Sequence, residues 1–248
     1  MNDAAPLAHI AIHDTVERIL AEVPRGRLLD VPTGEGALAQ RLWDLGFEVE
    51  CADLYPEIFK LKDRSVSRAD LDAELPFADG SFDYAVCVEG LEHIENPANA
   101  IREFRRILRP GGTLIVSVPN IMNIEERLRW LVSGYTSHFK PLSRTAIRDI
   151  SSEFPGMEEI ALHVNPIGYS EIRYLLEKNG FELIGVSQDA PKRKLWAFFP
   201  ITAAIRLSGR FVSSRKRATR WADELNSDEV LLGGNTLIFT ACRGNCTP

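Results

Sequence analysis

The feature that most constrains this chain is a regular alternation of short apolar runs with amphipathic helical patterns. A run of about four to eight apolar and β-branched residues is typical of a buried strand, and apolar residues three or four apart mark one helix face. Strands that alternate with helices favour a doubly wound α/β sheet, in which right-handed crossovers place helices on both faces. The predicted strands are residues 27–31, 48–54, 65–70, 82–88, 113–118, 181–186 and 236–241.

The length of 248 residues suits a single domain with one sizeable core. Two stretches interrupt the alternation and are predicted to be insertions within that domain (1–248): residues 121–166 and residues 191–228. No apolar run approaches the roughly 20 residues that a membrane span needs, and the N-terminus lacks the features of a signal peptide. The four cysteines are scattered and form no Cys-x-x-Cys pair, so neither a disulfide nor a structural zinc site is expected. These features predict a cytoplasmic protein.

Charge is distributed unevenly along the chain. There are 29 basic and 35 acidic residues in all, yet residues 191–220, the basic segment, hold nine Lys or Arg and no acid. Within this segment positive residues flank an aromatic and apolar stretch, as in helices that lie on anionic membranes. Two interpretations stay open. Residues 191–220 contact an anionic membrane surface or a lipid-linked substrate, or they form a solvated insertion whose apolar side completes the fold or a dimer interface.

A glycine turn follows the first predicted strand, where ligands bind in sheets of this kind. The turn reads Asp30-Val31-Pro32-Thr33-Gly34-Glu35-Gly36 and leads into a helix. Asp53 ends the second strand about twenty residues later, where a carboxylate can accept hydrogen bonds from both hydroxyls of a ribose. Asp70 ends the third strand, where its carboxylate suits an exocyclic adenine amine. The pattern predicts an adenosine-containing cofactor, and the glycine turn with Asp53 also suits NAD(P).

From residue 28 to residue 119 the chain resembles the class I methyltransferases that use S-adenosylmethionine (SAM), in particular small-molecule enzymes of the methyltransferase type 11 kind. The landmarks that carry the resemblance are the glycine turn, Asp53, Asp70 with Leu75-Pro76-Phe77 and Ser81-Phe82-Asp83, Glu89-Gly90-Leu91-Glu92-His93-Ile94, and Leu108-Arg109-Pro110-Gly111-Gly112. The resemblance implies a Rossmann-like, mostly parallel seven-stranded sheet with a C-terminal antiparallel strand pair. It also implies that residues 121–166 cover the substrate.

The same resemblance implies how SAM and its product, S-adenosylhomocysteine, are held. The methionine part lies near the glycine turn, the ribose lies on Asp53, and Glu89 lies under the sulfonium. The implied cofactor residues are Asp30, Pro32, Thr33, Gly34, Gly36, Asp53, Leu54, Asp70, Leu71 and Glu89. Pro32 departs from the family, which has a glycine at this position, and proline fixes φ and removes an N–H donor. The departure leaves room for a weakened or inactive site.

Methyl transfer is an in-line displacement, so catalysis depends mainly on the positioning of donor and acceptor. A hydroxyl acceptor must also lose a proton, and His93, four residues after Glu89, is the candidate base. The alternative is that His93 anchors its loop by a hydrogen bond to the backbone. His138 and His163 lie within 121–166 and are interpreted as structural or substrate-orienting residues. No metal-ligand spacing is visible, so no metal is expected.

The sequence therefore predicts a SAM-dependent methyltransferase, with O-methylation of a small-molecule, glycan or lipid-linked acceptor favoured. An NAD(P)-dependent oxidoreductase is the alternative enzyme, although Asp70 and residues 89–94 speak against it. A non-catalytic domain that binds SAM or a partner is the third interpretation. Nucleic acid is disfavoured as a substrate, because strand four ends in Glu89-Gly90-Leu91 where base N-methylation calls for an Asp/Asn-Pro-Pro-aromatic pattern. Membrane association and the oligomeric state stay open.

Overall fold

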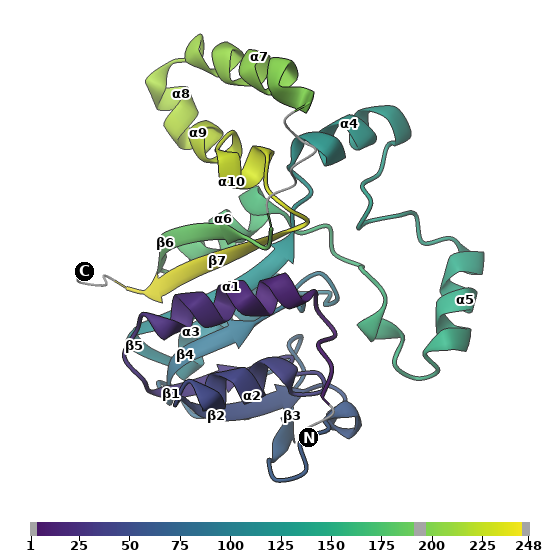
Figure 1. The fold of residues 1–248 in the computed structure, drawn as a ribbon, viewed down its shortest axis with the longest axis vertical. Helices are drawn as coiled ribbons and strands as arrows, with labels where there is room; N and C mark the ends of the chain where they lie inside the picture. The colour runs from purple at the N-terminus through teal and green to yellow at the C-terminus, as the bar shows by residue number, and fades with distance from the viewer. Residues whose placement is uncertain (1–3, 191–196, 245–248) are drawn as a thin grey trace.

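The computed structural model describes residues 4–190 and 197–244, which form one seven-stranded sheet flanked by helices. The strand order is β3-β2-β1-β4-β5-β7-β6 (Figure 1). β7 runs antiparallel to both β5 and β6, whereas β1 to β5 pair in parallel. The strands are β1 (Arg27–Asp30), β2 (Glu48–Asp53), β3 (Val66–Arg68), β4 (Phe82–Cys87), β5 (Leu108–Pro119), β6 (Phe181–Gln188) and β7 (Thr236–Arg243). The predicted mostly parallel sheet with an antiparallel C-terminal pair is confirmed.

Helices cover both faces of the sheet. α1 (Ile10–Ala21) and α2 (Ala37–Asp44) pack on one face through a single apolar cluster. α3 (Pro97–Ile107) and α6 (Tyr169–Lys178) pack on the other face through the largest cluster of the core. The central strands are apolar on both sides because both sides are covered.

The strand order reverses between β1 and β4, and ligands bind at such a switch point, outside the carboxyl ends of the strands. β1 pairs with β2 on one side and with β4 on the other. The turn after β1 therefore meets the loops after β2, β3 and β4 at one edge. The topology brings the glycine turn, Asp53, Asp70 and Glu89 to this edge.

A further group of helices extends away from the sheet and comes from two separate parts of the chain, residues 121–166 and 197–231 (Figure 1). We call this group the cap. An apolar cluster that includes Ile124, Leu128, Ile205 and Leu231 joins its two parts. The cap contains α4 (Ile124–Ser133), α5 (Arg144–Glu153), the 3-10 turn η2 (Glu158–Ile160), α7 (Phe199–Arg210), α8 (Ser214–Thr219), α9 (Ala222–Leu225) and α10 (Asp228–Leu231).

The structure differs from the sequence predictions at two places. β5 starts at Leu108, directly after α3, so Pro110-Gly111-Gly112 lies inside the strand, where the register with β4 shifts. Cys242 is disulfide-bonded, which contradicts the expectation of unpaired cysteines, whereas Cys51 and Cys87 are free and buried. Residues 191–196 of the basic segment lie outside the described residues. Within the described ranges, no helix combines the length and the apolar character needed to cross a bilayer.

Candidate functional site

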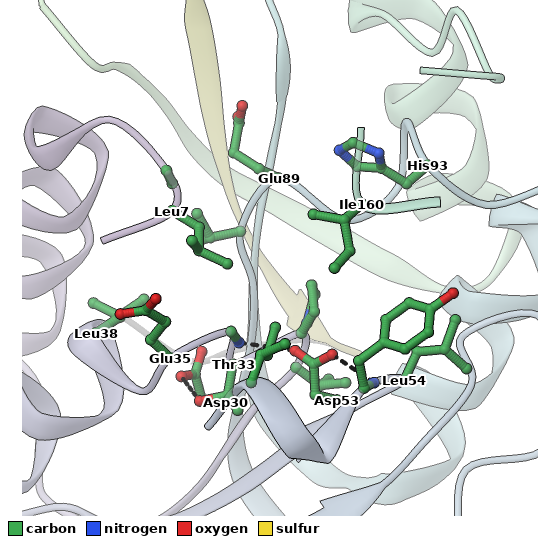
Figure 2. Close-up of a pocket in the computed structure, with 18 of the residues that line it drawn as sticks. Leu7, Asp30, Thr33, Glu35, Leu38, Asp53, Leu54, Glu89, His93 and Ile160 are labelled. Carbon is green, nitrogen blue, oxygen red and sulfur yellow. Dashed lines mark hydrogen bonds between the residues drawn. The ribbon is translucent and has the colours of Figure 1, made fainter. Parts of the chain in front are cut away.

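A cavity opens at the carboxyl edge of the parallel strands, and the loops after β1, β2, β3 and β4 form its walls (Figure 2). All the residues that the sequence associates with the cofactor line this cavity, except Gly36. His93 lines it as well. The predicted positions are therefore brought together in space, although their roles in binding stay predictions.

Asp30 is buried at the end of β1 and is tied to the glycine turn. Thr33 Oγ1 donates a hydrogen bond to Asp30 Oδ2 at 2.7 Å. Burial raises the pKa of Asp30 to about 7, because the bond from Thr33 opposes the increase only in part and the charge of Asp53 adds to it. Burial therefore makes the ionised form of Asp30 costly, and a positively charged ligand would stabilise it.

Asp53 ends β2 and holds the glycine turn with its own carboxylate. Its Oδ2 accepts a hydrogen bond from the Gly34 N–H at 2.8 Å, and its Oδ1 accepts one from the Tyr55 N–H at 2.9 Å. Burial raises the pKa of Asp53, and these backbone bonds oppose that increase. Each carboxylate oxygen has two lone pairs, so Asp53 can still accept from two ribose hydroxyls.

Pro32, which departs from the family pattern, packs closely against Gly90 of the loop after β4. A Cβ atom at Gly90 would lie 2.7 Å from Pro32 Cδ and 3.0 Å from Cys87 Sγ. The proline ring therefore occupies the space that a side chain at position 90 would take. The turn keeps its connection to β2, because the Thr33 N–H donates to the Ala52 carbonyl at 3.0 Å.

The two glycines of the turn have different surroundings, although both adopt a positive φ, 55° at Gly34 and 94° at Gly36. Gly34 lines the cavity, and a Cβ atom there would lie 3.0 Å from the side chain of Leu7. A Cβ atom at Gly36 would instead meet Phe59 at 2.7 Å and Leu61 at 2.8 Å. Gly36 thus lets α2 begin against the 59–61 segment and lies outside the set of residues that line the cavity.

Leu54, Asp70 and Leu71 come from the loops after β2 and β3. Leu71 is buried, whereas Asp70 is exposed and accepts a hydrogen bond from the Asp72 N–H at 2.8 Å. Asp72 accepts in turn from two backbone N–H groups that precede α3, at 2.6 and 3.0 Å. This part of the cavity combines apolar side chains with an accessible acceptor, as an adenine ring and its amine require.

Glu89 follows β4 with a φ of 49°, a left-handed conformation that is uncommon outside glycine and is found at functional sites. Its N–H donates to Ser117 Oγ at 2.8 Å, and that hydroxyl lies 3.2 Å from Glu89 Oε1, to which it donates. Burial raises the pKa of Glu89, and the hydrogen bonds from Ser117 and Thr236 oppose this increase. Residues of β5 and β7 therefore hold this carboxylate at the rim of the cavity (Figure 2).

His93 lies at the same rim and contacts the cap (Figure 2). Its Nδ1 lies 3.1 Å from the Leu162 carbonyl oxygen, and its ring stands edge-on to His163, with centroids 4.7 Å apart. The ring of His138 stacks on His163. The three histidines that the sequence singled out thus form one group. The backbone contact agrees with the loop-anchoring interpretation and the cavity position with the catalytic one, so both stay open.

Several residues that close the cavity carry no sequence motif. Leu7 and Ala8 of the N-terminal segment, His13 of α1 and Ile160 of the cap all line it. Burial lowers the pKa of His13 to about 4, and the charge of Arg41 contributes. His13 Nδ1 is buried and has no hydrogen-bond partner within the described residues. These side chains reach the cavity through the docking of α1 and the cap, which a one-dimensional pattern does not reveal.

The charge of the cavity discriminates between the two cofactors that the glycine turn allows. The acids that line it are Glu35, Asp30, Asp53, Asp70, Asp72 and Glu89, and among the described residues no Lys or Arg lines it. SAM carries positive charge on its sulfonium and its amino group, whereas a dinucleotide carries a negative pyrophosphate. Like charges repel strongly where burial excludes water. The cavity therefore fits SAM better than NAD(P).

Comparisons with known proteins agree with this geometry. A family model described as a methyltransferase domain matches residues 7–186. A protein of Xanthomonas campestris pv. campestris named ubiquinone biosynthesis O-methyltransferase is 36% identical over 139 residues, 48% of this chain and 56% of that protein. A protein of Renibacterium salmoninarum named demethylmenaquinone methyltransferase is 29% identical over 167 residues, 61% of this chain and 70% of that protein. The matched region spans about half the length of the first relative.

The fold is also shared with solved structures. A SAM-dependent methyltransferase from Archaeoglobus fulgidus superimposes with a TM-score of 0.59 over 95% of this chain and 94% of that chain, at 14% identity. At this identity the likeness concerns the fold alone. The match of the family model over most of the chain, together with the cofactor landmarks, shows that the chain belongs to the class I SAM-dependent methyltransferases.

Proposed function

We propose that this protein transfers the methyl group of SAM to a hydroxyl oxygen of a small, lipid-like acceptor. The observation that carries the proposal is the acidic cavity at the switch point, whose buried carboxylates suit a cationic cofactor. Asp30, Thr33 and Gly34 would hold the methionine part, Asp53 the ribose, and Asp70 the adenine amine. When bound, SAM supplies an electrophilic methyl group on a positively charged sulfur.

The acceptor is expected to approach from the side of the cap. Glu89, His93 and Ile160 lie on one side of the cavity, opposite the Asp30 and Asp53 carboxylates (Figure 2). His93 and Ile160 connect this side to residues 121–166, which we propose cover the acceptor. Nδ1 of His93 faces a carbonyl oxygen, which can only accept, so Nδ1 carries the proton of the neutral ring. Nε2 then has the lone pair that could take a hydroxyl proton.

The names of the relatives narrow the acceptor class. One relative is named as an O-methyltransferase of ubiquinone biosynthesis and another as a demethylmenaquinone methyltransferase. Both names refer to quinones, lipid-like molecules whose reduced forms are aromatic and carry hydroxyl groups. Since the sequence match covers only part of each protein, we propose the acceptor class, an aromatic hydroxyl compound with an apolar tail, and leave the individual compound open.

The proposal is tested by calorimetry of the purified protein with SAM, S-adenosylhomocysteine and NADH. We expect micromolar binding of the two sulfur compounds and none of NADH. Transfer of a radiolabelled methyl group to short-chain phenolic acceptors is then expected, with the label on oxygen. Binding of NADH alone would favour the oxidoreductase. SAM binding without transfer to any acceptor would favour the non-catalytic interpretation that Pro32 raises.

We also propose that the cap rests on an anionic membrane and receives the acceptor there. Large apolar side chains of α4 and of the end of α7 face solvent, with exposed fractions of 79% at Leu131, 87% at Val132 and 86% at Phe211. Exposed cations lie at the end of α7 and in the residues that follow it: Arg210, Arg215, Lys216 and Arg220. Apolar groups beside cations favour a surface of anionic lipid.

Co-sedimentation with vesicles tests the membrane proposal. Phosphatidylglycerol vesicles are expected to carry the protein down at low salt, and phosphatidylcholine vesicles to carry much less. The double variant Leu131→Glu with Phe211→Glu should stay in the supernatant. Ile184→Glu is the matched control, because Ile184 is an exposed apolar residue of β6, outside the cap. Absence of wild-type binding at low salt would refute the proposal.

A further inference from the structure

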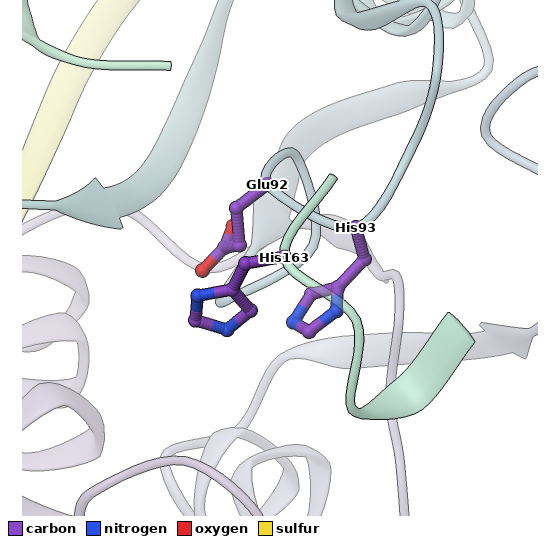
Figure 3. Close-up of side chains that lie close together, drawn as sticks. All are labelled: Glu92, His93 and His163. Atoms are coloured by element: carbon purple, nitrogen blue, oxygen red, sulfur yellow. The ribbon is translucent and has the colours of Figure 1, made fainter. Parts of the chain in front are cut away.

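Three potential metal ligands meet at the junction of the cofactor cavity and the cap. Glu92, His93 and His163 each offer one ligand atom, and these atoms lie within 4.8 Å of one another (Figure 3). Glu92 and His93 are neighbours in the loop after β4, whereas His163 comes from the cap segment that follows η2. No sequence spacing indicated this group, because His163 is brought in only by the fold.

Glu92 is the most unusual member of the group. Its side chain is fully buried, and neither carboxylate oxygen has a hydrogen-bond partner among the described residues. Its backbone carbonyl accepts from the N–H groups of Val164 and Asn165, both at 3.0 Å, which fixes the position of the residue beside the cap. Buried polar groups are nearly always paired, and an exception points to a ligand such as a water or an ion. A bound cation would neutralise this buried carboxylate and occupy its oxygen lone pairs.

Both histidines have the orientation that metal-bound histidines adopt. Nδ1 of His93 lies 3.1 Å from the Leu162 carbonyl, and Nδ1 of His163 lies 3.1 Å from the His138 carbonyl. A carbonyl oxygen only accepts, so each Nδ1 carries the proton of the neutral ring and each Nε2 carries a lone pair. A histidine that binds a metal through one ring nitrogen usually donates the N–H of the other nitrogen to a carbonyl or carboxylate, as Nδ1 does here.

We propose that Glu92, His93 and His163 bind a divalent transition-metal cation, with Zn²⁺ as the favoured ion. Two imidazoles and one carboxylate are a ligand set of catalytic zinc sites, which keep a further position open for water or substrate. Imidazole ligands favour zinc, iron or copper over magnesium and calcium, which prefer oxygen ligands. Ligand atoms around tetrahedral zinc are roughly 3.4 Å apart. The three ligand atoms, which lie within 4.8 Å of one another, would have to approach one another to reach that spacing when the ion binds.

The position of the site suggests its use, and this step rests on the proposed methyltransferase function. His93 belongs both to the ligand group and to the wall of the cofactor cavity. A cation there lowers the pKa of an acceptor hydroxyl in its open position, so the proton leaves to solvent without a side-chain base. The oxygen lone pair then forms the new O–C bond, and the S–C bond of SAM breaks to give neutral S-adenosylhomocysteine. His93 is a ligand in this scheme, and the cation takes over the role of the base.

Metal binding is measured first, without any acceptor. Tag-free protein is treated with a chelator, dialysed and titrated with Zn²⁺ by calorimetry, and bound metal is counted by mass spectrometry. We expect one equivalent of Zn²⁺ and a rise in the melting temperature that grows with the Zn²⁺ concentration. Mg²⁺ should bind far more weakly. A wild-type protein that takes up no Zn²⁺ would overturn the proposal.

Two variants and one control locate the site. Glu92→Gln and His163→Gln should each weaken Zn²⁺ binding at least about 100-fold, since even supporting residues around metal ligands contribute about 10- to 100-fold. His138→Gln is the matched control, because its side chain stacks on His163 but is not part of the ligand group. His163→Gln keeps the test open if Glu92→Gln fails to fold. Unchanged Zn²⁺ binding in both variants would refute the site.

SAM titrations of the same samples separate this proposal from the proposed function. Zn²⁺ binding without SAM binding would leave the metal site standing and remove the methyltransferase role. SAM binding together with transfer that is equally fast in chelator-treated and Zn²⁺-loaded protein would remove the catalytic use of the cation.

Discussion

The two sides of the cavity are built in different ways. On the cofactor side, Asp30 and Asp53 end buried strands, and hydrogen bonds of 2.7 to 2.9 Å fix them to the glycine turn and to the backbone. On the cap side, α5 buries none of its side chains fully, and α4 and α7 expose large apolar residues. The difference suggests that cofactor binding depends on the rigid sheet edge, whereas acceptor access depends on a loosely packed surface.

The largest effect is expected from Asp53→Ala, which removes the proposed ribose acceptor from the rigid side. The variant loses hydrogen bonds to a charged acceptor and also frees the N–H groups of Gly34 and Tyr55. We expect SAM affinity to fall about 1000-fold, or about 4 kcal/mol. Calorimetry measures the loss. Asp63→Ala is the control, because Asp63 is an exposed acid near the same loop that does not line the cavity. Equal affinities in both variants would show that Asp53 does not hold the cofactor.

Asp30→Asn tests whether the buried negative charge of Asp30 lowers the stability of the folded protein. The folded-state pKa of Asp30 is about 7, above the ordinary value of 3.8, so the folded protein binds more protons than the unfolded chain between these pH values. Stability therefore falls as pH rises through this window, and Asn avoids that loss. We expect the variant to be more stable than wild type at pH 8 by about 4 kcal/mol, with the gain vanishing near pH 4.

Urea unfolding at pH 4, 6 and 8 checks this prediction. His13, whose pKa is lowered to about 4, makes an opposite contribution between pH 4 and 6.5, but wild type and variant share it. SAM binding should weaken in the variant despite its greater stability. A stability difference that stays constant with pH would mean that the charge of Asp30 is not its source.

Gly90→Ala probes the pairing of Pro32 with the loop after β4. The new methyl group would lie 2.7 Å from the Pro32 ring, which requires one of the two loops to shift. We expect a loss of about 2 kcal/mol, typical of overpacking. Pro32→Gly in the same chain should recover part of that loss, because it removes the ring. A thermal-denaturation cycle of both single variants and the double variant measures the coupling. Additive effects would contradict the pairing.

The cofactor side could be predicted from the sequence because its information is local. A strand, a glycine turn and an acid about twenty residues later appear as one pattern, and the topology then brings Asp53 and Glu89 to the same edge. The sequence does not predict that β5 starts at Leu108, because Pro110-Gly111-Gly112 is a helix-end signal that parallel pairing with β4 overrides. Gly36 belongs to the same turn but does not line the cavity, and a glycine motif alone does not show which of its glycines does so.

The cap side could not be predicted, because its contacts join distant residues. His163 reaches His93 only through the docking of residues 121–166, and His13 reaches the cavity through the packing of α1. The carboxylate of Glu92 resembled any other acid in the motif until its burial without a partner was visible. Lone side chains of this kind have no periodicity or spacing that would mark them.

The smallest effect is expected from Ile147→Ser in α5, which tests the loose packing of the cap. Ile147 is 41% exposed in a helix with no fully buried side chain, so its removal costs little apolar burial. We expect a change of less than about 0.5 kcal/mol in the free energy of unfolding and unchanged SAM affinity. If α5 contributes to acceptor entry, the KM for an apolar acceptor should rise while kcat stays constant, because only ground-state contact is lost. A large drop in stability would show that the cap is part of the cooperative core and would break the contrast between the two sides.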